Sequence, residues 1–228
     1  MSSLNAPSPD LAGRVRAALP RLKVFPLPPA VLFPGVSMPL HIFEPRYRAL
    51  VRDALATDGV FALAGLEDGW EWDTTGRPAL RAIACAGVIT WHEGLPQGRF
   101  NLLLEGQLRV RILEEHPQQG PYREVVAEAL ESLEEPAPAE EATVRQGLLE
   151  LATLLPQDAA QVLVQEGARA RGGALADVVA AAVVADAERR RALLEELSPR
   201  VRLREVMEDV SEVLAQLRTR ARPGGLPN

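Results

Sequence analysis

The sequence predicts an α+β protein in which a small, mostly antiparallel β-barrel is followed by a helical bundle. Three observations lead to this prediction. Up to about residue 135, short apolar runs alternate with Gly and Pro, as in small β structures. From about residue 140, apolar residues recur at the three- and four-residue spacing of helices. Between the two lies an acidic, proline-bearing stretch, residues 134–139, which suits neither a helix nor a central strand.

These changes of texture predict four parts. Residues 1–21 form an N-terminal extension, 22–135 the barrel subdomain, 136–222 the helical subdomain, and 223–228 a disordered tail.

The first part of the chain is expected to form six or seven strands and one short helix near residues 10–19. Pro45 suits the first position of a further helix, and Tyr47, Leu50 and Val51 begin its apolar stripe, which Gly59 ends. Gly106-Gln107 is predicted to be the turn of a hairpin. A polar loop at residues 67–78 carries Trp70 and Trp72. The expected strands cover residues 22–27, 37–42, 60–66, 81–91, 100–105, 108–113 and 122–130.

The second part is expected to hold five helices. Asp186 and Ser198 are suitable N-cap residues, and Pro199 suits the first position of the last helix. The predicted helices cover residues 140–155, 158–168, 174–185, 186–197 and 199–220.

Composition and charge narrow the function classes. The net charge is −6. Residues 1–135 hold 13 Lys and Arg against 17 Asp and Glu, and residues 136–228 hold 12 against 14, so neither part is basic. This balance argues against nucleic acid as the main ligand. No apolar run has the roughly 18 residues of a membrane span. With a polar N-terminus and a single cysteine, Cys85, a cytoplasmic protein is expected.

The chemistry-bearing residues predict no catalytic site, metal or cofactor. His41, His92 and His116 lack the spacing of a zinc site, and Cys85 lies in an apolar run where a buried, inert thiol is expected. A phosphate-binding G-x-x-x-x-G-K-[ST] loop and a G-x-S-x-G elbow are both absent from the sequence.

Three segments resemble the N-terminal, LON substrate-binding domain of Lon proteases. Residues 32–35 read LFPG and residues 39–47 read PLHIFEPRY, like the opening of that domain. Residues 87–112, GVITWHEGLPQGRFNLLLEGQLRVRI, are similar to its glycine-led strand and following turn. The helical pattern of residues 175–217 is similar to its C-terminal bundle. Ala86-Gly87, where the family often has Gly-Thr, and the proline-rich residues 27–30 depart from the pattern, and the first twenty residues have no counterpart in it.

The resemblance covers roughly residues 22–217 and implies a PUA-like pseudo-barrel followed by helices. It also implies a protein-binding role without catalysis. Because the sequence lacks the ATPase and Ser-Lys protease motifs, a stand-alone, non-enzymatic form is expected, such as an adaptor or a regulator of proteolysis. Its partners would be unfolded or specific protein segments, bound through apolar surface between barrel and bundle. The expected peptide-binding residues are Leu32, Phe33, Phe43, Glu44, Tyr47, Trp70 and Trp72.

Four alternatives stay open at this point. Glu44 and Arg46 could contact a peptide or form a local ion pair at the start of a helix. Trp70 and Trp72 could be exposed anchors or a lid folded over the barrel. The chain could instead be an RNA-binding PUA-like module, which would require Arg99, Arg109 and Arg111 to converge on one open face. A hydrolase would require a deep pocket that holds a carboxylate or histidine of strongly shifted pKa.

Overall fold

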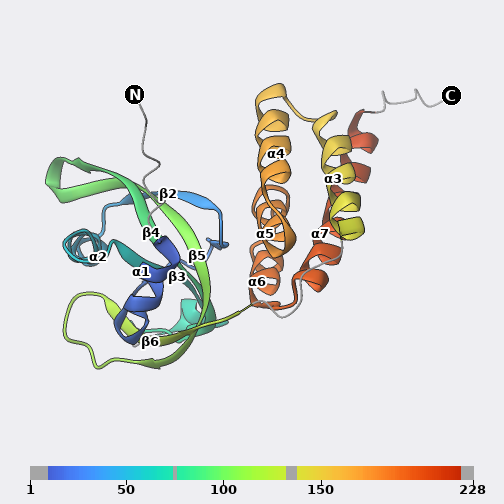
Figure 1. Cartoon of the computed structure of the whole chain (residues 1–228). Coiled ribbons are helices and arrows are strands. Elements are labelled where there is room, and N and C mark those ends of the chain that lie inside the picture. Colours follow the sequence, from blue (N-terminus) through green and yellow to red (C-terminus); the bar gives the residue numbers. More distant parts are fainter. Residues whose placement is uncertain (1–9, 74–75, 132–137, 222–228) are drawn as a thin grey trace, which may run out of the picture. The chain divides into compact units, whose positions relative to one another are not determined.

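The computed structural model describes residues 10–73, 76–131 and 138–221, and these fall into two compact units. The barrel unit contains the chain up to Leu27 and Ser37–Ala129, and the helical unit contains Pro28–Val36 and the chain from Leu130 onward. Figure 1 shows the strands in the first unit, with helices beside them, and helices in the second. The predicted α+β class is confirmed.

The barrel unit is built on six strands, with the order β2-β5-β4-β3-β1-β6 and a further pairing of β5 with β6. That last pairing closes β5, β4, β3, β1 and β6 into a ring, and β2 adds to β5 outside it. Among the strands of the described residues, only β1 and β3 run parallel. The strands are β1 (Leu22–Pro26), β2 (Ser37–Ile42), β3 (Val60–Leu66), β4 (Leu80–Leu95), β5 (Arg99–Glu115) and β6 (Arg123–Ala129).

The long strand β5 shows that the predicted hairpin at Gly106-Gln107 is wrong. Both residues lie inside β5, and the hairpin turn is Pro96–Gly98, between β4 and β5. Gly106 instead pairs with Gly87 where the β4–β5 register shifts. A Cβ on Gly87 would lie 2.7 Å from the carbonyl oxygen of Glu105, so the two strands approach too closely there for a side chain. The glycine signal marked this close approach and not a turn.

The inside of the ring is filled mainly by small side chains, because a narrow barrel leaves little interior room. Helix α1 (Leu11–Ala18) packs against this core through Leu11, Val15 and Ala18. Its N-cap is Asp10, whose carboxylate accepts a 2.7 Å hydrogen bond from the Gly13 N–H. Residues 11–18, predicted to belong to an N-terminal extension, are therefore part of the barrel's packing. The buried strand residues of this core are Leu22, Val24, Val60, Ala62, Ala64, Ala84, Ala86, Val88, Val110, Val125 and Ala127.

The helical unit contains five described helices joined by short turns. As predicted, Asp186 caps α6 by accepting from the Arg189 N–H at 2.7 Å. Likewise, the Ser198 hydroxyl accepts from the Val201 N–H at 3.3 Å where α7 begins. Gly172 and Gly173 begin α5 and do not lie outside it. The helices are α3 (Pro138–Ala152), α4 (Gln157–Arg169), α5 (Gly172–Val183), α6 (Ala187–Glu195) and α7 (Pro199–Ala221). Of the described helices, none has the length and hydropathy needed to cross a membrane.

Two features of the helical unit depend on distant parts of the sequence. Pro28–Val36 groups with the helices, although it lies between two barrel strands in sequence, and its Leu32 and Phe33 are fully buried. Inside the unit, Arg202 of α7 and Asp177 of α5 form a buried ion pair with Nε and Oδ1 3.1 Å apart. The Arg202 Nη1 also donates to the Glu196 carbonyl at 2.8 Å.

Candidate functional site

The segment Phe43–Arg48 holds a helix of the barrel unit in place. Glu44 is the extended N-cap residue of α2 (Pro45–Leu55), and Pro45 takes the first helical position. The Arg46 guanidinium lies 2.9 Å from the Glu44 carboxylate and 4.6 Å from the centre of the Tyr47 ring. Glu44 therefore makes the local ion pair that was one of its two expected roles.

The next two side chains of this segment point into the protein. Tyr47 is buried, and its ring centre lies 4.1 Å from that of Phe25 of β1. Burial raises the pKa of the Tyr47 hydroxyl more than the nearby Arg46 charge lowers it. Arg48 donates to the carbonyl of Gln97, a residue with φ +66° in the β4–β5 turn. Tyr47 and Arg48 thus fix α2 against the barrel and against the tip of the hairpin.

Phe43 remains outside this packing, on an exposed sheet surface that we call the aromatic face. Side chains alternate along a strand, so β2, β5 and β4 present one set of residues outward. The register aligns Pro39 with Leu103 and Trp91, and His41 with Asn101. Phe43 is 60% exposed and Trp91 is 50% exposed. The aromatic face consists of Pro39, His41, Phe43, Trp91, Asn101 and Leu103.

Polar contacts order the middle of the aromatic face. The His41 Nδ1 lies 2.7 Å from the Asn101 Oδ1, and the His41 ring stacks on Phe43 with centres 6.1 Å apart. Sequence reasoning left Trp91 out of the site because it ends an apolar run that was expected to be buried. The sequence signal for the exposure of Trp91 is strand alternation, since Trp91 and the charged Glu93 lie two residues apart and therefore on one face. This part of β4 belongs to the green hairpin that projects from the barrel in Figure 1.

The two tryptophans predicted to bind peptide lie away from the aromatic face. Trp70 and Trp72 belong to a 3-10 turn (Trp70–Trp72) next to the end of β4 that pairs Leu80 with Leu66. The aromatic face is at the opposite end of β4, where Gly94 pairs with Phe100. Trp70 is 38% exposed and Trp72 is 85% exposed, so Trp72 points into solvent and does not cover the barrel as a lid.

The seven predicted site residues are therefore divided among four environments. Leu32 and Phe33 are core residues of the helical unit, and Tyr47 is a core residue of the barrel unit. Phe43 lies on the aromatic face with Glu44 next to it in the chain at the start of α2, and Trp70 and Trp72 lie in the β3–β4 loop. Only the last two groups offer side chains to a partner.

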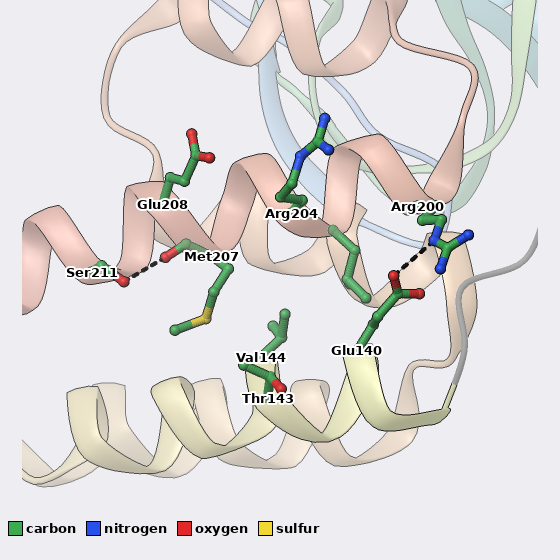
Figure 2. A pocket seen from close by; sticks show the side chains of 9 residues that line it. Glu140, Thr143, Val144, Arg200, Arg204, Met207, Glu208 and Ser211 are labelled. Atoms are coloured by element: carbon green, nitrogen blue, oxygen red, sulfur yellow. Dashed lines mark hydrogen bonds and ion pairs between the residues drawn. The ribbon is translucent and has the colours of Figure 1, made fainter.

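A groove lies between α3 and α7 of the helical unit (Figure 2). It comprises two adjoining pockets of about 510 and 620 Å³ that share Thr143, Met207 and Ser211. An ion pair between Glu140 and Arg200, 2.7 Å long, borders one end. Its apolar floor is shallow, because Val144 and Leu203 are already almost completely buried by the helices.

The arginines of the RNA-binding alternative do not form one open face. Arg109 is 6% exposed, and Arg111 pairs with Glu128 at 2.8 Å. The Arg99 Nε donates to the carbonyl of Pro96 at 3.2 Å.

The shifted ionisable groups of the barrel unit have structural partners. Burial alone would raise the pKa of Glu115, but hydrogen bonds from Arg123 and Arg77 outweigh it and lower the pKa below its ordinary value. Burial and a 2.7 Å hydrogen bond to Asp53 raise the pKa of Tyr122. Within the described part of the chain, there is no group of three or more His, Cys, Asp or Glu that could hold a metal ion.

The fold is that of Lon N-terminal domains. The N-terminal domain of a Mycobacterium avium complex Lon protease aligns with a TM-score of 0.64 at 19% identity, over 84% of this chain and 98% of that one. A Lon N-terminal domain protein from Xanthomonas campestris aligns with a TM-score of 0.58 at 26% identity, over 82% of this chain and 97% of that one.

The sequence comparisons give the family. The model of the ATP-dependent protease La (LON) substrate-binding domain matches residues 21–211. The chain belongs to this family, which confirms the resemblance seen in the sequence. Lon protease 2 of Myxococcus xanthus is 27% identical over 191 residues, and the Lon protease of Roseiflexus castenholzii is 30% identical over 195 residues. The chain covers 23% of the length of each of these two relatives, and each match covers 82% of the chain.

Proposed function

We propose that the chain is a non-catalytic module that binds exposed apolar segments of other proteins. The observation that carries this proposal is the aromatic face, where Phe43 at the end of β2 and Trp91 of β4 are at least half exposed to solvent. Exposed aromatic side chains on a firm support are typical anchors of protein interfaces. Membership of a substrate-binding family supports the same conclusion.

The absence of catalysis is part of the proposal. Two side chains that could act in catalysis have structural surroundings. The His116 Nε2 lies 3.0 Å from the Pro20 carbonyl, and Cys85 is buried in β4. A binding module of this kind would act as an adaptor or regulator that presents protein segments for proteolysis. The purified chain is therefore expected to bind unfolded protein without hydrolysing it.

The aromatic face can be tested with a permanently unfolded, carboxymethylated protein that carries a fluorescent label. Fluorescence anisotropy with the parent chain should give saturable binding. In the double variant Phe43→Ala/Trp91→Ala, Kd should rise at least about tenfold, because two anchors of the interface are removed. Both side chains lie on the surface, so the circular dichroism spectrum and Tm should stay unchanged. Phe33→Ala and Tyr47→Ala are unsuitable variants because they remove core side chains.

The matched control is Leu113→Ala, which removes another exposed apolar side chain of β5, 56% accessible, away from the aromatic face. Its Kd should stay within about twofold of the parent value. Equal Kd values for the parent and the double variant would contradict the proposal. So would retention of a labelled single-stranded RNA in place of the unfolded protein, although the buried Arg109 and paired Arg111 argue against that outcome.

A further inference from the structure

The loop that follows β3 combines exposed tryptophan with negative charge. Glu67–Asp73 has the sequence EDGWEWD, in which four residues are acidic, two are tryptophan and none is basic. Trp72 is the most exposed large apolar side chain of the described residues, at 85%. Glu67 and Glu71 of the same loop are also exposed. Exposing the apolar indole to water is unfavourable, and the carboxylates of the loop favour a partner of positive charge.

Hydrogen bonds hold the base of this loop against the neighbouring strands. The Glu67 N–H donates to the Ala79 carbonyl at 2.9 Å. Arg81 of β4 donates to the Leu66 carbonyl at 3.1 Å and lies 2.6 Å from the Asp68 carboxylate. The Trp72 N–H donates to the Gly69 carbonyl at 3.0 Å, and Gly69 has φ +84°, a conformation that glycine adopts readily. A held loop loses less entropy when a partner binds.

The chemistry selects a cationic occupant. The face of an indole carries negative charge density and attracts a cation placed over it. Glu67 and Glu71 add acceptors for the same cation, whereas they repel phosphate or a carboxylate. Arginine suits this site better than lysine, because the planar guanidinium can stack on the indole ring while the N–H groups at the guanidinium edge donate to carboxylates.

We propose that the loop Glu67–Asp73 is a docking site for an arginine-bearing segment of a partner protein, with the guanidinium against Trp72. The proposal rests on the proposed function only in taking the partner to be a protein. It uses a different surface, at the other end of β4 from the aromatic face.

The test uses the full chain and three labelled peptides of alternating glycine and a second residue, which is arginine, lysine or glutamate. Anisotropy at about 0.15 M salt should rank arginine above lysine, with no binding of the glutamate peptide. Trp72→Ala and Glu71→Gln should each raise Kd for the arginine peptide at least about fivefold. These are exposed positions, so an unchanged Tm will show that the variants are folded.

Two controls separate a docking site from general attraction to an acidic protein. Trp91→Ala removes an exposed indole elsewhere, and Glu93→Gln removes the same charge elsewhere on β4. Both should keep Kd within about twofold of the parent value. The proposal is overturned if these controls weaken binding as much as the loop variants, or if the arginine peptide does not bind. Loss of unfolded-protein binding in Phe43→Ala/Trp91→Ala, with arginine-peptide binding intact, would show that the two surfaces act separately.

Discussion

Adjacent residues of one short segment have opposite roles in this protein. Phe43 is exposed, while Tyr47 is buried against Phe25 and Arg48 secures the β4–β5 turn. The sequence identified the segment as important but could not separate these roles. The helical spacing predicted that Tyr47 faces the core, yet Phe43 precedes the helix, where periodicity gives no direction.

Glu115 is the residue whose charge matters most clearly for stability. Its carboxylate accepts from Arg123 at 2.5 and 2.6 Å and from Arg77 at 2.6 Å. Its folded pKa is lowered from the ordinary value of 4.5, so its contribution is complete above that value and disappears as the pH falls through the folded pKa. The free energy of unfolding of the parent, measured in urea, should therefore fall steeply below about pH 4.5.

Glu115→Gln should be less stable than the parent at neutral pH and should show a shallower loss on acidification. Glu114→Gln is the control, because that neighbouring side chain is exposed and its loss leaves the Glu115 contacts in place, so the variant should keep the parent's profile. An unchanged acid slope in Glu115→Gln would mean that other carboxylates cause the acid sensitivity.

At the scale of elements, the buried ion pair between Asp177 and Arg202 joins α5 to α7. Removing one partner leaves the other charge buried without its counter-ion, which typically costs about 3–5 kcal/mol. Asp177→Ala should therefore lower the free energy of unfolding by about that amount in urea titrations. The exposed pair of Glu150 and Arg218, 3.0 Å apart, gives the matched comparison. Glu150→Ala should cost no more than about 1 kcal/mol, and an equal loss in both variants would contradict this reading.

The sequence predicted elements well where their signals are local. Ser37–Ile42 and Val60–Leu66 have the predicted bounds, and Asp186 and Ser198 cap helices as expected. It failed at Gly106, because a glycine inside a strand beside a register shift looks the same in sequence as a glycine in a turn. The burial of Arg109 was missed for a related reason: strand alternation gives the face of a side chain but not what covers that face.

At the scale of the whole molecule, the chain leaves the barrel after Leu27, contributes Pro28–Val36 to the helical unit, and returns at Ser37. No local pattern in residues 28–36 predicts that this segment belongs to the helical unit, since a proline-rich run predicts only an extended path. The exposed surface of Phe33, expected from the sequence, is consequently not available to a peptide: the side chain is part of a core.

This crossing predicts where a core mutation will be felt. Phe33→Ala should destabilise the helical unit by about 3–5 kcal/mol, as large-to-small core changes do. Hydrogen-exchange mass spectrometry should show faster exchange in α3 to α7, while the amides of β3, β4 and β5 keep their protection. Phe43→Ala, on the surface, should change neither set. Loss of protection in the barrel strands before the helices would show that Phe33 supports the barrel instead.

The position of Pro39 has a consequence for how molecules of this protein meet one another. β2 pairs with β5 on one side and is the outermost strand of the described sheet. Proline has no N–H, so Pro39, opposite Leu103, must turn its nitrogen toward the free edge. A strand from a second molecule would find a donor missing in the middle of that edge. The aromatic face can therefore remain accessible to binding partners while the backbone of the neighbouring edge disfavours fibre-like, strand-by-strand aggregation.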